Sequence, residues 1–374
     1  MRGNYSLKTL IALFLSFLGT ITSHEENAVR GTHKTITSHE ANVDESNVPF
    51  DKILVAYQSW SECDNATITA VENGVNVVIW FATNLDSDEE GNAVLTGGPN
   101  HTCVEGKIAQ LAGMGYGRDK VKHLISVGGW DAPHPDTSNT AEEYAEAFEV
   151  FSGGLFDGLD WDLEGNDSLT AKWNYFSKEC LELMADLSKI LHDRGYIISM
   201  APPESYLDIQ TTAFSKYVNL TYPDDDWGDD PPFSYHGHNV YSYPLAKEPD
   251  AFDFVSIQIY ETKSHASYNT TVLGVPQVDY MTSYIKSLVE EGVTVDFTTD
   301  EDFKELGVQK IKMNKIIVGL ISAGGVGGPI TAANASKVFA ELEEGSNIDG
   351  FFFWCIGDDK DGSLPKVLGE GIWG

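Results

Sequence analysis

Three carboxyl groups occupy alternate positions of one short, otherwise mostly apolar segment: Asp160, Asp162 and Glu164 within residues 156–164. In a β-strand, residues i, i+2 and i+4 point to the same face, so neighbouring carboxyls would lie about 7 Å apart. Buried like charges at such spacing cannot all ionise. The pattern therefore indicates a site that holds a proton at a raised pKa.

The same segment carries a family resemblance. Together with Asp157, the row reads D-x-x-D-x-D-x-E, with a glycine after the first Asp. This resembles the motif of glycoside hydrolase family 18, the chitinases and their relatives, and four acidic positions at fixed spacing make the match specific. Asp157 is out of phase with the inward row, so we expect it to have a structural role that supports the strand and its neighbours.

The elements that must position this row follow from hydrophobic periodicity. Eight apolar or β-branched runs predict strands at Ile53–Trp60, Val75–Ala82, Val121–Gly128, Phe156–Glu164, Tyr196–Pro202, Phe252–Tyr260, Lys315–Ile321 and Gly350–Ile356. Helical spacing is clearest at Ala141–Phe151, Ser168–Arg194, Tyr280–Glu291 and Ala335–Glu344. Eight strand–helix repeats predict an α/β fold, a closed (β/α)8 TIM barrel, whose chemistry lies at the C-terminal ends of the strands.

Other distinctive residues fall at the ends of the expected strands and are similar to family 18 elements. Residues 126–129 read S-x-G-G and end at Gly129, where a glycine pair lets backbone and ligand approach closely. Gln258 and Tyr260 resemble the Q-x-Y of strand six, and Trp354 resembles the tryptophan of strand eight. The motifs occur in the family's order and on the expected strands.

The resemblance implies substrate-assisted hydrolysis with retention of configuration, without a metal or other cofactor. Glu164 would protonate the glycosidic oxygen while the substrate's own N-acetyl group attacks the anomeric carbon. Asp162 would stabilise the acetamido group and share a proton with Asp160. Tyr260 would hold the acetamido oxygen in place.

The resemblance also implies which residues line the substrate pocket. Trp354 would form the floor beneath the reacting sugar, since sugar rings present an apolar face to aromatic side chains. The further lining residues that we expect are Tyr57, Gln258, Met200, Trp130 and Gly129.

Two features of the loops set expectations for the substrate groove. About 28 residues separate expected strands seven and eight, which leaves no room for the α+β insertion domain that deepens the cleft in some family members. We therefore expect a single-domain barrel with an open groove and endo cleavage. The insert from Glu204 to Asp250 is expected to form a long loop beside that groove, and Glu261 stands where relatives often carry Asn or Asp.

The N-terminal region predicts export. Residues 1–23 combine basic residues with a short apolar run and small residues, which is typical of a secretory signal peptide. Residues 24–50 are polar and unpatterned and are expected to be a disordered leader, with a propeptide as the alternative, and 51–374 to be the catalytic domain. We expect a secreted, extracellular protein.

Glycosylation and cysteine use fit this compartment. Six Asn-x-Ser/Thr acceptors follow the expected signal peptide, at Asn65, Asn100, Asn166, Asn219, Asn269 and Asn334. Four cysteines allow three pairings; we favour a disulfide between Cys63 and Cys103, with Cys180 and Cys355 as buried thiols.

A formal net charge of −33 argues against nucleic acid and anionic membranes as partners, and we expect a monomer. The acidic run 86–90 begins like a calcium-binding loop, but its twelfth position is Gly97 instead of Glu, so solvated loop charge is the better interpretation.

The resemblance favours a chitinase that hydrolyses β-1,4 linkages between N-acetylglucosamine units. An endo-β-N-acetylglucosaminidase acting on N-glycan cores would use the same acids, and an open groove suits a branched ligand. A non-catalytic chitin-binding lectin and a glycosidase inhibitor on the same barrel are further alternatives, although the intact acidic row argues against both. Whether the substrate is chitin or another N-acetylglucosamine-containing glycan stays open.

Overall fold

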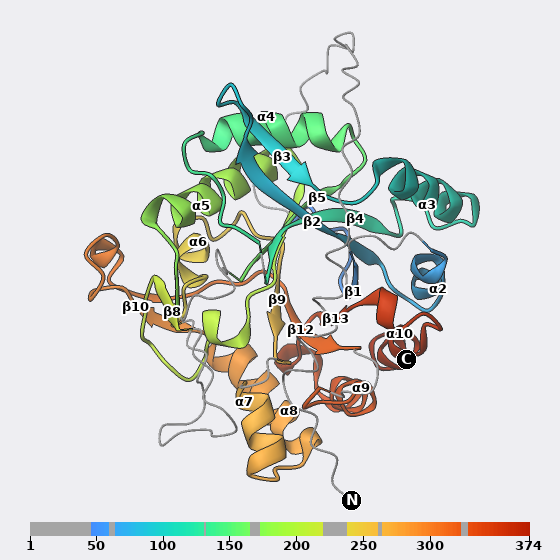
Figure 1. Ribbon diagram of the computed structural model, residues 1–374. Helices are drawn as coiled ribbons and strands as arrows, with labels where there is room; N and C mark the ends of the chain where they lie inside the picture. Colours follow the sequence, from blue (N-terminus) through green and yellow to red (C-terminus); the bar gives the residue numbers. More distant parts are fainter. Residues whose placement is uncertain are drawn as a thin grey trace, which may run out of the picture. The chain divides into compact units, whose positions relative to one another are not determined.

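The computed structural model describes residues 46–59, 64–130, 132–164, 173–219, 238–260, 264–322 and 328–374. Eight parallel strands form a barrel that is closed by pairing of the first strand with both the second and the last, and helices surround it (Figure 1). The barrel strands are β1 (Ile53–Gln58), β2 (Val77–Ser87), β4 (Lys122–Gly129), β5 (Gly158–Leu163), β7 (Ile197–Met200), β9 (Phe254–Gln258), β12 (Ile316–Ile321) and β13 (Gly350–Trp354). The predicted (β/α)8 fold is confirmed.

Strand β2 runs further than its apolar pattern predicts. It continues to Ser87 and forms an antiparallel hairpin with β3 (Ala93–Gly97). The acidic run 86–90 lies at this hairpin, where Asp88 accepts hydrogen bonds from the Glu90 backbone N–H (3.0 Å) and the Asn92 side chain (2.9 Å). These hydrogen bonds lower the pKa of Asp88, the side chain of Asn92 most, so the run acts as an acidic turn.

The described helices are α2 (Ala66–Glu72), α3 (His101–Gly113), α4 (Ala141–Ser152), α5 (Lys178–Asp193), α6 (Ser242–Lys247), α7 (His265–Ser267), α8 (Gln277–Lys286), α9 (Ala332–Glu341) and α10 (Ser363–Trp373). The start that we predicted for one helix, Ser168, is wrong. α5 begins after Ser177, whose hydroxyl caps it by accepting from the Cys180 N–H. Before that cap, β6 (Trp173–Tyr175) pairs with β8 (Tyr217–Asn219).

Regular elements also occupy the insert that we expected to be a long loop. Its described residues contain η1 (Glu204–Tyr206), β8 and α6. Between β9 and β12 lie η2 (Tyr268–Val272), η3 (Ser287–Glu291), β10 (Thr294–Asp296), η4 (Lys304–Leu306) and β11 (Val308–Lys310); η5 (Glu344–Ser346) and η6 (Ile356–Asp358) flank β13. Of the residues described between β12 and β13, none forms a strand, so this part of the chain holds no α+β insertion domain.

Side chains of the barrel strands alternate between two apolar clusters, one inside the barrel and one between strands and helices. On β1, Ile53, Val55 and Tyr57 belong to the inner cluster, whereas Leu54 and Ala56 belong to the outer one. Position along a strand therefore decides whether a side chain can reach the barrel interior.

The segment just before β1 corrects the extent of the leader, which we expected to reach residue 50. Ser46 Oγ donates to Asp253 Oδ1 (2.8 Å), and the Asn47 side chain donates to two backbone carbonyls next to the end of α5 (both 3.0 Å). Val48 is buried in the inner cluster. These contacts make Ser46–Phe50 part of the domain; the signal peptide and the rest of the leader lie outside the described residues.

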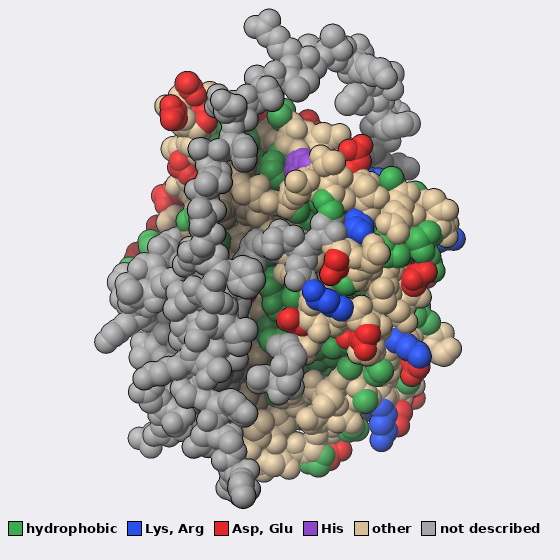
Figure 2. All heavy atoms as spheres, turned by 45° about the vertical axis from the view of Figure 1, so that its right-hand side comes forward, with side chains coloured by type: hydrophobic (Ala, Val, Ile, Leu, Met, Phe, Trp, Pro, Cys, Tyr) green, Lys and Arg blue, Asp and Glu red, His purple; other side chains and the backbone are tan. Residues whose placement is uncertain are grey.

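Cys180 and Cys355 carry buried thiol groups. Cys103 is disulfide-bonded, but its expected partner Cys63 lies outside the described residues, so their pairing stays a prediction. Among the helices of the described residues, none combines the length and apolarity needed to cross a bilayer. On the face displayed in Figure 2, acidic and basic side chains are scattered among apolar ones.

Candidate active site

Strand β5 carries the acidic row into the barrel. Trp161 and Leu163 pack in the outer apolar cluster, so Asp160 and Asp162, at the opposite parity, face inward. Both carboxyls are buried, with exposed fractions of 0% and 5%, and Glu164, one residue past the strand, is half-buried. The row thus runs from the barrel interior towards its C-terminal end.

Asp160 is surrounded by hydroxyl groups. Tyr57 Oη (2.9 Å) and Ser126 Oγ (2.9 Å) donate to its Oδ2, and Ser199 Oγ (2.6 Å) donates to its Oδ1. The two serines lie beside Asp160 in register on β4 and β7. Burial raises the pKa of Asp160 to about 6, although the three hydroxyl donors favour the charged form and oppose the shift.

Asp162 interacts with the other two carboxyl groups of the row. Its pKa is raised well above the ordinary value, first by burial, then by the charges of Glu164 and Asp160, and by a side-chain hydrogen bond with Glu164. We expected Asp162 to share its proton with Asp160. That sharing stays a prediction: the charge of Asp160 contributes to the shift, and Asp162 is also hydrogen-bonded to Glu164.

Gln258, at the end of β9, contacts both of these acids. Its amide nitrogen lies 3.0 Å from Asp162 Oδ1, 3.2 Å from Glu164 Oε1 and 2.7 Å from the Ala201 carbonyl oxygen. An amide carries only two N–H hydrogens, so these three acceptors share them. Gln258 therefore orients the two acids. Its expected contact with substrate stays a prediction.

Aromatic side chains form one wall beside the row. The Trp354 ring lies 5.8 Å from that of Tyr57 and 4.7 Å from that of Phe81, and Phe352 packs against Tyr57 (5.6 Å) and Tyr260 (6.0 Å). Trp354 and Tyr260 are half-buried, which leaves ring surface accessible. Phe81 is a contact that the sequence patterns did not single out.

The glycine pair at the end of β4 is needed for packing inside the protein. Gly128 and Gly129 have φ angles of +109° and +113°, which side-chain-bearing residues rarely adopt. A Cβ at Gly129 would lie 2.4 Å from the Phe81 ring, and one at Gly128 would lie 2.6 Å from the Asp162 carbonyl oxygen. Protein atoms therefore fill the space that a side chain would take here, and the expected contact of Gly129 with ligand stays a prediction.

Two further residues that we expected to line the pocket lie in different surroundings. Met200 is fully buried and packs in the outer cluster between strands and helices, because it lies at the opposite parity to Ser199, which faces Asp160. The expectation that Met200 lines the pocket is wrong. Trp130, directly after β4, is 38% exposed. Glu261 lies outside the described residues.

Asp157 lies at the other end of β5. It accepts hydrogen bonds from the His123 backbone N–H (2.8 Å) and from Arg118 Nη1 (2.7 Å), and Arg118 also binds the Leu155 carbonyl (2.7 Å). Asp157 thus connects the starts of β4 and β5.

Within the part of the chain that the structure describes, no group of three or more His, Cys, Asp or Glu side chains could hold a metal ion. A cavity of about 710 Å³ lies between α3 and α4, lined by residues such as His101, Arg118 and Phe151 and by none of the acidic row. It is therefore separate from the candidate site.

The sequence matches no protein-family model and no curated protein. Solved structures are similar. A family GH18 chitinase from Chromobacterium violaceum superposes with a TM-score of 0.59 at 17% identity, covering 87% of this chain and 84% of that chain. The C-terminal domain of ChiA from Legionella pneumophila gives 0.56 at 15% identity, covering 84% and 97%. The catalytic domain of a family GH18 chitinase from the fern Peteris ryukyuensis gives 0.51 at 14% identity, covering 86% and 99%. At these identities the likeness establishes the fold, which is that of family 18 chitinases.

Proposed function

We propose that this protein is a secreted glycoside hydrolase of the chitinase type, which cleaves β-1,4 linkages between N-acetylglucosamine units with retention of configuration. The observation that carries the proposal is the carboxyl row at the C-terminal end of β5. Asp162 is hydrogen-bonded to Glu164, and Tyr57, which donates to Asp160, packs against the half-buried Trp354 ring (5.8 Å).

Glu164 is the member of the row that lies past the strand end and is partly exposed, which supports its assignment as the acid. In the proposed first step, its proton passes to the glycosidic oxygen and the bond from that oxygen to the anomeric carbon breaks. The acetamido oxygen of the substrate forms a new bond to that carbon, giving an oxazolinium intermediate. In the second step Glu164 takes a proton from water, and the water oxygen bonds to the anomeric carbon as the bond from that carbon to the acetamido oxygen breaks.

The rest of the row supports this proton transfer electrostatically. Asp162 holds a proton at raised pKa against Glu164, so it stabilises the carboxylate that remains once Glu164 has given up its proton. Burial is the largest cause of this raised pKa, and the charge of Asp160, which is fixed by three hydroxyls, adds to it. Tyr260 is assigned to the acetamido oxygen and Trp354 to the apolar face of the sugar ring.

The test compares soluble chitin oligomers with a high-mannose glycoprotein as substrates, and uses Glu164→Gln as the control for contaminating activity. We expect turnover of the oligomers, with the β-anomer as the first product detected by NMR. Early α-anomer would overturn the retaining mechanism. Turnover of the glycoprotein alone would identify an endo-β-N-acetylglucosaminidase, and oligomer binding without turnover would identify a lectin.

A further inference from the structure

The backbone at the end of β5 loses its regular strand partner where the acidic row ends. The Trp161 carbonyl accepts the last ladder hydrogen bond, from the Ala201 N–H (2.8 Å). In a parallel ladder the next donor would be residue 203, which would bind the Leu163 carbonyl. Residue 203 is proline and has no N–H, so the ladder cannot continue.

One tyrosine hydroxyl replaces this missing donor, and a second binds the next carbonyl of the chain. Tyr241 Oη donates to the Leu163 carbonyl (3.0 Å), and Tyr206 Oη donates to the Glu164 carbonyl (2.6 Å). Both tyrosines are fully buried, and burial raises the pKa of Tyr241 well above its ordinary value. Its phenol therefore keeps its proton and remains a donor over the working pH range.

The segments that carry these tyrosines are joined to each other. The Tyr241 N–H donates to the Tyr206 carbonyl (3.1 Å), and the Asn239 N–H donates to the Ser205 carbonyl (3.1 Å). The two rings pack with centroids 5.7 Å apart, and Phe176 packs against both, at 5.9 and 6.3 Å. Tyr206 and Tyr241 therefore form one packed and hydrogen-bonded unit.

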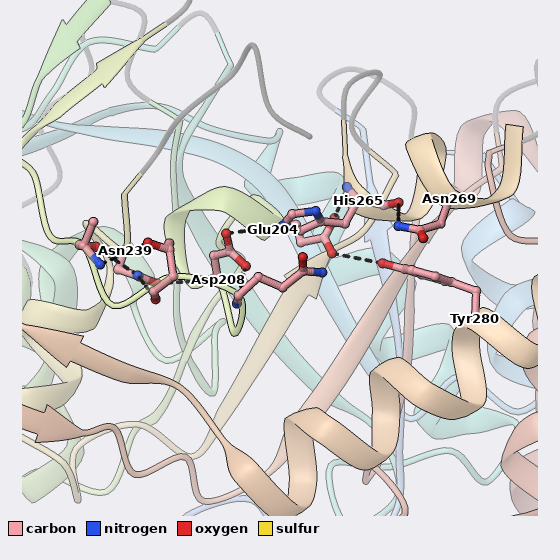
Figure 3. Close-up of polar contacts among 9 residues, drawn as sticks. Glu204, Asp208, Asn239, His265, Asn269 and Tyr280 are labelled. Atoms are coloured by element: carbon pink, nitrogen blue, oxygen red, sulfur yellow. Dashed lines mark hydrogen bonds and ion pairs between the residues drawn. The ribbon is translucent and has the colours of Figure 1, made fainter. Parts of the chain in front are cut away.

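A buried polar cluster anchors this unit (Figure 3). Glu204 accepts from the His265 backbone N–H at the start of α7 (3.0 Å) and from Tyr280 Oη on α8 (3.3 Å). His265 Nε2 lies 3.3 Å from Asp208 Oδ2, and the Asp208 N–H donates to Asn239 Oδ1 (2.6 Å). Burial, followed by the charge of Asp208, raises the pKa of Glu204 well above its ordinary value.

We propose that Tyr206 and Tyr241 are positioning residues for Glu164, and that the cluster of Glu204, Asp208, Asn239 and His265 holds them in place. Their role in catalysis rests on the function proposed above. The geometry gives the reason: two phenols fix the last peptide groups of the strand that presents the acid. Because a displacement of about 1 Å at a reacting group can lower the rate by about a hundredfold, this placement affects catalysis directly.

The first experiment measures kcat and KM on soluble chitin oligomers for Tyr206→Phe and Tyr241→Phe. Each change removes one hydroxyl and keeps the packed ring. We expect kcat to fall about ten- to hundredfold while KM stays within about twofold. The matched control is Tyr144→Phe on α4, because Tyr144 is also fully buried and donates to a backbone carbonyl, that of Asp136 (2.7 Å), outside the site. It should leave kcat unchanged.

A second readout does not require turnover. Burial raises the pKa of Asp162 most, and the charge and hydrogen bond of Glu164 raise it further, so displacement of Glu164 should lower it. With ¹³C-labelled aspartate and Asp162→Asn for assignment, we expect the Asp162 titration midpoint to fall by about half a pH unit or more in Tyr206→Phe. The midpoint should not change in Tyr144→Phe.

The anchoring cluster is tested by a pair of changes at Glu204. Because the protonated carboxyl resembles an amide, Glu204→Gln should retain most of the kcat, whereas Glu204→Leu should reproduce the loss seen in Tyr206→Phe. A Tyr206→Phe variant with an unchanged Asp162 midpoint and the kcat of the control would overturn the positioning proposal. A wild-type protein that turns over no oligomer would overturn the proposed function, and the Asp162 titration would then decide the positioning by itself.

Discussion

The two ends of the barrel strands use acidic side chains in opposite ways. At the N-terminal ends, an Asn or Asp directly precedes every second strand and accepts a backbone N–H from the start of the strand before it. These strand-start residues are Asn76 with Leu54 (2.8 Å), Asp157 with His123 (2.8 Å), Asp253 with Ile198 (2.8 Å) and Asp349 with Ile316 (2.9 Å). At the C-terminal end, Asp160 is held by side-chain hydroxyls, and Asp162 contacts Gln258 and Glu164.

Burial alone does not decide the role of a carboxyl. Asn76, Asp157 and Asp349 are half-buried, but Asp253 is as buried as Asp160, and burial raises the pKa of both. The two sets of carboxyls differ in their hydrogen-bond partners. A backbone N–H is fixed by the strand and cannot rearrange, so a carboxyl that binds it has a structural role. Side-chain hydroxyls, amides and neighbouring carboxyls can exchange protons and rotate, as a reaction cycle requires.

The largest expected difference between the ends is in catalysis. Glu164→Gln removes the proton donor and preserves the shape of the side chain, so kcat on chitin oligomers should fall about 10²- to 10⁴-fold. Steady-state kinetics measure this, and thermal unfolding should show little change in stability. Retention of most of the wild-type rate would assign the acid to another residue.

The next effect is a pH dependence of stability from Asp160. The folded-state pKa of Asp160, about 6, lies above the ordinary 3.8. Its contribution to the free energy of unfolding is therefore fully present below about pH 4 and is lost as the pH rises through 6. The loss is on the order of 3 kcal/mol. Urea unfolding between pH 3.5 and 7.5 should show a smaller decline for Asp160→Asn than for the wild type; parallel curves would contradict the assignment.

A smaller effect is expected at the structural end. Asp253→Ala removes the acceptor for the Ile198 N–H and for the Ser46 hydroxyl, and should lower the free energy of unfolding by about 1–3 kcal/mol. Asp253→Asn keeps one acceptor oxygen and should lower the free energy of unfolding by a smaller amount. The kcat per folded molecule should stay at the wild-type value, and a reduced kcat would remove the distinction between the ends.

The smallest effect is expected from Met200→Leu, a volume-conserving change in the outer cluster. Both kcat and KM should stay within about twofold of wild type, whereas Trp354→Leu should raise KM. Kinetics on chitin oligomers compare the two. An increase in KM in the Met200 variant would show that Met200 does line the substrate pocket.

The sequence predicts the barrel well because each strand is a continuous buried run, and the carboxyl row because its period matches a strand. It does not reveal Ser199, although the serine has the inward parity of Asp160 on the adjacent strand. That contact depends on register between strands, which periodicity within one strand cannot supply. For the same reason Met200 was assigned to the wrong side of β7.

Tyr206 and Tyr241 were missed for a different reason. Their role arises where a ladder hydrogen bond is absent, and the local signal is the pair Pro202 and Pro203 at the end of β7. Only the register of β5 against β7 shows which carbonyl loses its donor. The Tyr241 hydroxyl, from the loop before α6, binds that carbonyl, and the Tyr206 hydroxyl, from η1, binds the carbonyl of Glu164. These two segments are far from β5 in the chain.

The strand-start residues have a consequence for the order of folding. Each joins two neighbouring strands over a short stretch of chain, with separations of 22, 34, 55 and 33 residues. Closure of the barrel, in contrast, pairs Ile53 with Gly350. Since the entropy lost on forming a loop grows with its length, we expect four strand pairs to assemble early and the β1–β13 seam to form last.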